Sequence, residues 1–160
     1  MLHNGEKLFA YRFDGYWRDV GTIASLWESN MDLISENPPI SLSDKNFRIY
    51  SRNSARPPQF IGANAVVENS MISEGCRVHG KVENSILSGG VIIEECAEVY
   101  NSVIMEDVRI CSGARVYNAI IDSDAVVENG GVVGKIGADK NDITVIAKGT
   151  SVKADISSGA

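Results

Sequence analysis

The sequence predicts a mainly β protein, a parallel β-solenoid preceded by one strand and one helix. The main observation is a four-residue phrase that begins at Asn69, Asn84, Asn101 and Asn118 and reads Asn-Ser, or once Asn-Ala, followed by two apolar residues. The phrase recurs in steps of 15, 17 and 17 residues. Repetition at a nearly fixed period is typical of solenoids, because one coil must stack on copies of itself to bury its apolar face.

A shorter apolar period lies inside the long one. β-Branched residues recur in pairs six apart, at Ile93, Val99, Ile110, Val116, Val127 and Val133. A helix would need apolar residues at three- and four-residue spacing, whereas β-branched residues at a spacing of six favour short strands. The pattern resembles the hexapeptide-repeat family of left-handed parallel β-helices over residues 60–152. This resemblance leaves the function open, because such solenoids serve as acyltransferases, as metalloenzymes and as passive assembly modules.

Composition narrows the classes of partner. The chain has 160 residues and a net charge of −6, so it is long enough for one domain and a fragment of another. Lys and Arg form no basic stripe, and we therefore expect neither a nucleic-acid nor a membrane-surface partner. No apolar run approaches the roughly 20 residues that span a bilayer. The N-terminus does not have the form of a signal peptide, so we expect a cytoplasmic protein.

Three cysteines, Cys76, Cys96 and Cys111, are an odd number without a CxxC spacing. Neither a disulfide framework nor a zinc site is therefore predicted. Cys76 occupies the repeat position that valine or alanine fills in the later coils, which predicts a small buried residue.

The segments outside the repeats predict a few further elements. Leu8–Phe13 alternates after a polar turn and predicts a strand whose sheet partners lie upstream of this chain. Thr22 is the predicted N-cap of an amphipathic helix, Ile23–Ile34, which ends before a pair of prolines. Phe47–Tyr50 predicts a short strand in a connector, and Ile143–Ile146 predicts a strand that caps the last coil.

A more specific resemblance begins at Gly15-Tyr16-Trp17-Arg18-Asp19-Val20-Gly21-Thr22. This phrase, the helix through Ser25–Leu33, the strand Phe47–Tyr50 and the Pro57-Pro58 entry to the solenoid follow one another in an order similar to the C-terminal part of bacterial glucose-1-phosphate adenylyltransferases. In that family an α/β nucleotidyltransferase domain precedes the β-helix. The family's reaction joins ATP and glucose 1-phosphate into ADP-glucose and pyrophosphate for glycogen synthesis.

The resemblance implies a division of the chain. Residues 1–36 are the C-terminal remnant of the nucleotidyltransferase domain, 37–59 a connector, 60–152 the left-handed β-helix and 153–160 a tail. The β-helix is then expected to serve oligomerisation and allosteric regulation, in a homo-oligomer or together with a related regulatory subunit. Apolar surface on the predicted strand and helix is expected to lack its partner and to promote self-association.

The resemblance also implies site residues. Asp19 matches the family's aspartate that is expected to hold Mg²⁺ together with an aspartate from the upstream domain, because Mg²⁺ neutralises phosphate oxygens in such transfers. Its presence favours the catalytic over the regulatory type of subunit. Tyr16 and Trp17 are expected to border the sugar-phosphate pocket, although two aromatic residues on a strand also suit a core.

The ATP-binding half of the family's site does not occur in this sequence. The glycine-rich run Gly130–Gly134 lies in a coil and precedes no predicted helix, so it does not predict a phosphate loop. We therefore expect the chain alone to be inactive and to bind no cofactor.

Alternative functions remain open at this stage. A free-standing hexapeptide-repeat acyltransferase would use a histidine base, and His79 in the short coil 78–82 is the candidate, although an exposed turn position is its simpler interpretation. A histidine zinc site would need about three imidazoles, and the sequence has two. Another sugar-phosphate nucleotidyltransferase is the third alternative.

Overall fold

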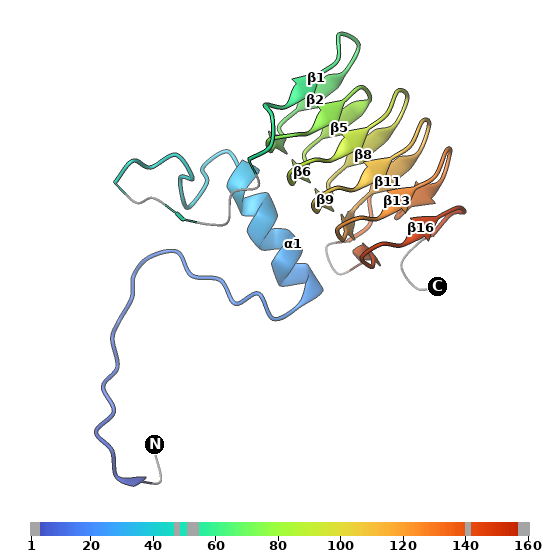
Figure 1. The fold of residues 1–160 in the computed structure, drawn as a ribbon. Coiled ribbons are helices and arrows are strands. Elements are labelled where there is room, and N and C mark those ends of the chain that lie inside the picture. Colours follow the sequence, from blue (N-terminus) through green and yellow to red (C-terminus); the bar gives the residue numbers. More distant parts are fainter. Residues whose placement is uncertain (1–3, 47–48, 51–54, 140–141, 157–160) are drawn as a thin grey trace.

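The computed structural model describes residues 4–46, 49–50, 55–139 and 142–156. Its main body is a parallel β-helix of three sheets, each built from short strands of successive coils, with one helix alongside (Figure 1). Every strand pair within these sheets is parallel. The predicted solenoid is therefore confirmed.

Each coil contributes strands to the three sheets in turn. Sheet A contains β1 (Phe60–Ile61), β4 (Arg77–Val78), β7 (Ile92–Ile93), β10 (Arg109–Ile110), β13 (Val126–Val127) and β16 (Ser151–Val152). Sheet B contains β2 (Val66–Glu68), β5 (Lys81–Glu83), β8 (Glu98–Tyr100), β11 (Arg115–Tyr117) and β14 (Val132–Val133). Sheet C contains β3 (Met71–Ile72), β6 (Ile86–Leu87), β9 (Val103–Ile104), β12 (Ala119–Ile121) and β15 (Thr144–Ile146).

The six-residue apolar period becomes the core of the β-helix. Ile93 pairs in register with Ile110, and Val99 with Val116, and all four side chains are fully buried. Burying one such side chain contributes about 1.5–3 kcal/mol. Cys76 is fully buried in the same core, as predicted.

The asparagines of the repeated phrase form the corner between sheets B and C. Asn69, Asn84, Asn101 and Asn118 have φ between 40° and 47°, a left-handed conformation that asparagine tolerates better than most residues. The Nδ2 group of Asn69 donates to Oδ1 of Asn84 at 2.8 Å, and Nδ2 of Asn84 donates to Oδ1 of Asn101 at 2.6 Å. The repeated asparagine therefore turns the chain and also links successive coils.

The serines of the same phrase satisfy the buried backbone at this corner. The backbone N–H groups of Ser85, Ser102 and Ala119 donate to Oγ of Ser70, Ser85 and Ser102 respectively, each at 3.1 Å. Each of these three hydroxyls also donates to the carbonyl oxygen two residues before it. Ser85 and Ser102 are completely buried. A hydroxyl is needed here because an unpaired buried N–H group is costly.

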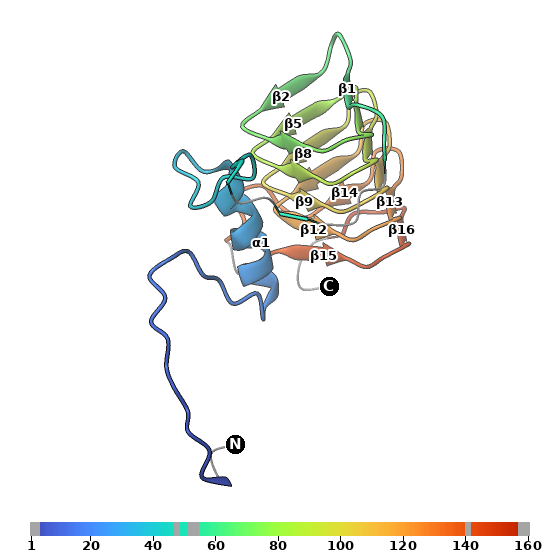
Figure 2. The ribbon, with the colours of Figure 1, turned by 60° about the vertical axis from the view of Figure 1, so that its left-hand side comes forward.

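Helix α1 (Ile23–Met31) continues as the 3₁₀ turn η2 (Asp32–Ile34) and lies along the outer face of sheet C (Figure 2). Thr22 is its N-cap, as predicted: the Ser25 backbone N–H donates to Oγ1 of Thr22 at 3.1 Å, and the Thr22 N–H donates to Oγ of Ser25 at 3.0 Å. The α-helix ends at Met31 and the 3₁₀ turn at Ile34, so both end before Pro38 and Pro39.

Sheet C is apolar on both faces, and its outer face forms the seat of α1. The outward side chains of Val103 and Ile120 are almost completely buried against Leu26 and Trp27. The indole Nε1 of Trp27 donates to the carbonyl oxygen of Asn101 at 2.8 Å. The helix therefore packs Leu26 and Trp27 on the solenoid, and the expectation of unmatched apolar surface is wrong for these two residues, whereas Ile23 stays 52% exposed.

The predicted strand Leu8–Phe13 is absent from the described residues. This segment runs away from the solenoid as a single extended stretch (Figure 1), and Phe9 and Tyr11 are about nine-tenths exposed, at 91% and 89%. An isolated stretch has no neighbour for its backbone hydrogen bonds, so alternation alone does not make a strand. Of the predicted strand Phe47–Tyr50, Ile49 and Tyr50 belong to no strand, and 47–48 lie outside the described residues.

The C-terminal coil is more regular than the sequence predicts. The strand Ile143–Ile146 is confirmed as β15, and it pairs in register with β12 as the next strand of sheet C. Ile156 forms a parallel bridge with Val133. The predicted tail therefore begins as part of the solenoid, although the loop after Gly134 interrupts the repeat.

Replacing Ser102 with alanine tests the role of the serine ladder. The change leaves the buried Ala119 N–H without its acceptor, so we expect the free energy of unfolding to fall by about 1–3 kcal/mol in urea titrations. The control is Ser112→Ala, which removes an exposed hydroxyl that donates to the Glu95 carbonyl oxygen at 2.9 Å. Equal losses in the two variants would contradict a special role for the buried hydroxyl.

Candidate functional site

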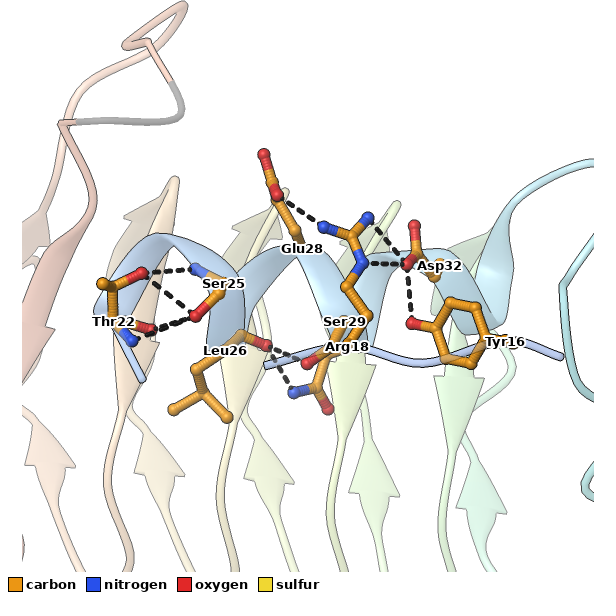
Figure 3. Close-up of polar contacts among 9 residues, drawn as sticks. Tyr16, Arg18, Thr22, Ser25, Leu26, Glu28, Ser29 and Asp32 are labelled. Atoms are coloured by element: carbon orange, nitrogen blue, oxygen red, sulfur yellow. Dashed lines mark hydrogen bonds and ion pairs between the residues drawn. The ribbon is translucent and has the colours of Figure 1, made fainter. Parts of the chain in front are cut away.

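The N-terminal arm, residues 14–22, is tied to α1 by a polar cluster (Figure 3). The hydroxyl of Tyr16 donates to Oδ2 of Asp32 at 2.8 Å, and Nε of Arg18 donates to the same oxygen at 3.0 Å. Nη1 of Arg18 donates to Oε2 of Glu28 at 2.8 Å. Tyr16 and Arg18, two residues apart in the arm, thus bind two acidic side chains that lie one helical turn apart.

Tyr16 and Arg18 keep their protons near neutral pH. Partial burial and the hydrogen bond to Asp32 raise the pKa of the Tyr16 phenol. Hydrogen bonds to Glu28 and then Asp32 raise the pKa of the Arg18 guanidinium. Neither group changes its protonation state under ordinary conditions. Tyr16 and Arg18 therefore tether the arm to the helix, and neither of them is a general base near neutral pH.

The predicted site residues separate into two groups. Tyr16 is half-buried against α1, whereas Trp17 is 73% exposed and Asp19 is exposed. In the described part of the chain, no group of three or more His, Cys, Asp or Glu side chains could hold a metal ion. Asp19 also forms no hydrogen bond or ion pair with any described residue. The arm therefore presents Trp17 and Asp19 outward, away from the residues that hold it in place.

His79 is not the exposed turn residue that the sequence predicts. It is half-buried directly after β4, and its ring centroid lies 5.6 Å from that of Phe60. It lines a groove together with Lys81, Glu95 and Cys96. The side chain packs against the first coil because Gly62 in that coil leaves room for its ring.

The other motifs adopt structural roles. Cys76 and Cys111 are buried, and burial raises the pKa of both thiols, so neither is a reactive thiolate. Cys96 is exposed, and the three cysteines are free. The run Gly130–Gly134 supplies a turn and strand β14, and no helix follows it in the described residues.

The polar cluster includes residues that the sequence did not single out. Arg18, Glu28 and Asp32 were parts of a phrase and a helix, with no role predicted for their side chains. The signal was available in the spacing, because Tyr16 and Arg18 lie on one side of an extended stretch and Glu28 and Asp32 on one side of a helix. Only the docking of arm and helix shows that the two pairs meet.

Comparison with known proteins shows which family shares this β-helix. A family described as "GlmU-like, C-terminal hexapeptide" matches residues 57–152. The chain belongs to this family. Membership in a hexapeptide family supports the left-handed β-helix that the sequence predicts.

Curated relatives extend the similarity beyond the repeats. A glucose-1-phosphate adenylyltransferase of Clostridium perfringens (strain SM101 / Type A) is 56% identical over 99 residues, which are 62% of this chain and 26% of the relative. One of Bacillus mycoides (strain KBAB4) is 45% identical over 151 residues, which are 93% of this chain and 39% of the relative. One of Clostridium beijerinckii is 59% identical over 93 residues, which are 58% of this chain and 24% of the relative.

The chain thus spans between about a quarter and two-fifths of the length of these relatives.

Among the described residues, no helix is both long enough and apolar enough to cross a bilayer.

Replacing Arg18 with methionine tests the tether. Methionine keeps an unbranched side chain but cannot bind Glu28 or Asp32, so we expect the backbone order parameters of residues 16–20 to fall from about 0.85 to below about 0.6 in ¹⁵N relaxation measurements. The matched control is Arg12→Met, because Arg12 forms only an exposed contact to Asp14 at 3.7 Å among the described residues. An arm that stays rigid in Arg18→Met would show that other contacts position it.

Proposed function

We propose that this chain is the C-terminal part of a glucose-1-phosphate adenylyltransferase, which joins ATP and glucose 1-phosphate into ADP-glucose and pyrophosphate. The observation that carries the proposal is the extent of the Bacillus mycoides match. A match covering 93% of the chain must include most of residues 1–56, which lie before the region matched by the hexapeptide family. Similarity of repeats alone would not extend into the arm and α1.

The relatives do not favour the alternatives. Those compared above carry the name of one enzyme, glucose-1-phosphate adenylyltransferase. An acyltransferase would need a histidine base at an acyl-donor site, and none of the relatives compared above is named for an acyl transfer. A different nucleotidyltransferase would have to recognise another sugar or another base. The names of the relatives support the reaction with ATP and glucose 1-phosphate.

Asp19 is the residue of this chain that we assign to Mg²⁺. Its carboxylate offers oxygen ligands, it is exposed, and it is not neutralised by any basic side chain of the described residues. When bound, Mg²⁺ would neutralise charge on the phosphate oxygens of the substrates. The arm presents Asp19 and Trp17 together on its outward side, while Tyr16 holds the arm to α1. Tyr16 is thus a positioning residue in this proposal, and Trp17 is the one that can border a sugar phosphate.

The β-helix is proposed to act in assembly and regulation. It carries no catalytic group in this account, and its flat sheet faces suit contact with other subunits of the same chain. Phe9, Tyr11 and Phe13 leave exposed apolar surface on the segment before the arm. This surface favours packing against an upstream domain or self-association of the isolated chain. A related regulatory subunit and a cytoplasmic location remain part of the same proposal.

Replacing Asp19 with asparagine in the enzyme that includes the upstream domain tests the proposal. We expect kcat/KM for ADP-glucose formation to fall at least about 100-fold, or about 2.7 kcal/mol, together with a higher Mg²⁺ requirement, because the metal loses a charged ligand. The 160-residue chain alone is expected to be inactive. The control is Asp14→Asn, an exposed carboxylate in the same arm.

Two outcomes would count against this function. Full activity with an unchanged Mg²⁺ requirement in Asp19→Asn would remove the metal role of Asp19. Failure of the complete wild-type enzyme to form ADP-glucose from ATP and glucose 1-phosphate would contradict the reaction itself.

A further inference from the structure

Sheet B carries a column of side chains at one register position. Glu83 pairs with Tyr100, and Tyr100 with Tyr117. The two tyrosine rings stack at a centroid distance of 5.4 Å and an interplanar angle of 15°. Nζ of Lys81, on the strand at the far side of Tyr100, lies 5.0 Å from the Tyr100 ring centroid. One end of this short stack is therefore covered by a cation.

The other end of the stack is open. Gly134 follows Val133 as Tyr117 follows Val116, and these two valines pair in register. A Cβ atom at Gly134 would lie 1.8 Å from the carbonyl oxygen of Tyr117, and the glycine has φ of 77°. No side chain can therefore continue the column here. Among the described residues, no aromatic ring stacks on the second face of Tyr117.

A pocket occupies this position. It is lined by Tyr100, Tyr117, Glu98 and Asn101 and by the loop 135–138, and we call it the tyrosine pocket. Its volume is about 250 Å³. Sites for drug-sized ligands begin at about 300 Å³, so this pocket has room for about one ring.

The polar groups around the pocket can still form hydrogen bonds. Glu98 has only long contacts, 3.5 Å to the Tyr117 hydroxyl and 4.0 Å to Nε of Arg115, so its carboxylate retains acceptor capacity. Oδ1 of Asn101 accepts from Asn84, while Nδ2 of Asn101 donates to no described residue. The tyrosine pocket therefore offers a hydrogen-bond acceptor and a donor in addition to its aromatic wall.

Asn118 holds the loop that closes the tyrosine pocket. Nδ2 of Asn118, which is 6% exposed, donates to the carbonyl oxygens of Asp139 and Asp142 at 3.2 Å and 3.4 Å. Asn118 therefore turns toward the loop, away from the asparagine ladder. The shape of the pocket is therefore fixed by two contacts. Asn118 holds the loop, and Tyr100 stacks against Tyr117.

We propose that the tyrosine pocket binds one pyranose unit of a neutral saccharide, with the ring's C–H face on Tyr117 and its hydroxyls at Glu98 and Asn101. A pyranose is apolar on its face and offers donors and acceptors around its rim, which matches this arrangement. An anionic ligand would meet Lys135 of the loop, but it would also lie beside the Glu98 carboxylate, and the chain carries a net charge of −6, so a neutral ligand avoids this repulsion. None of these residues belongs to the arm, so the proposal is independent of the proposed reaction.

Titration of the ¹⁵N-labelled chain with maltoheptaose and, separately, with cellohexaose tests this site. We expect one of them to shift the amide signals of Tyr117 and the loop 135–138, with a dissociation constant below about 10 mM. Tyr117→Ala should weaken binding at least about tenfold, because the stacking face is lost, and Tyr117→Phe should change it less than about threefold. The control is Tyr11→Ala, which removes an exposed tyrosine far from the pocket.

A second variant guards against a folding defect in Tyr117→Ala. Ala138→Trp places a large side chain on the loop without altering a strand, and it should abolish the same signal shifts. Three results would overturn the proposal. The first is that neither saccharide shifts these amide signals, and the second is that binding survives in both Tyr117→Ala and Ala138→Trp. The third is that adenosine monophosphate shifts the same signals whereas the saccharides do not.

Discussion

The seat of α1 on the outer face of sheet C is the contact on which the rest of this structure depends. A β-helix coil needs only its inward side chains to be apolar, yet Val103 and Ile120 point outward and are buried beneath the helix. Sheet C is thus sandwiched between the solenoid core and α1. The Trp27 indole adds directionality, because its N–H binds the carbonyl oxygen that the left-handed Asn101 turns outward. The repeat itself therefore prepares the docking of a non-repeated element.

Docking of α1 gives the arm a fixed place. Glu28 of α1 and Asp32, the first residue of η2, bind Arg18 and Tyr16, so the polar cluster couples the arm to the solenoid through the helix. Asp19 and Trp17 then project from the outward side of the arm. In the proposed function, the β-helix positions the arm through α1, in addition to its proposed role in assembly and regulation.

The solenoid could be predicted closely because its information is local and repeated. Ile93, Val99 and their counterparts fall in the predicted register, and the terminal strand Ile143–Ile146 exists. Pairing partners outside the repeat could not be predicted in the same way. Alternation suggested a strand at Leu8–Phe13, but a strand requires a neighbour that hydrogen-bonds to it. The outward burial of Val103, the grip of Arg18 and the packing of His79 on Phe60 likewise depend on contacts between segments far apart in sequence. The metal role of Asp19 stays a prediction.

Comparison of two unfolding signals in the Trp17→Phe variant, in which Trp27 is the only tryptophan, tests the docking most directly. If α1 and the solenoid form one cooperative unit, the urea midpoint of Trp27 fluorescence coincides with that of the β-sheet circular dichroism, and Val103→Ser lowers both together. A fluorescence transition that is complete at a clearly lower urea concentration, while the sheet signal is unchanged, would show that the helix detaches independently and would contradict the account.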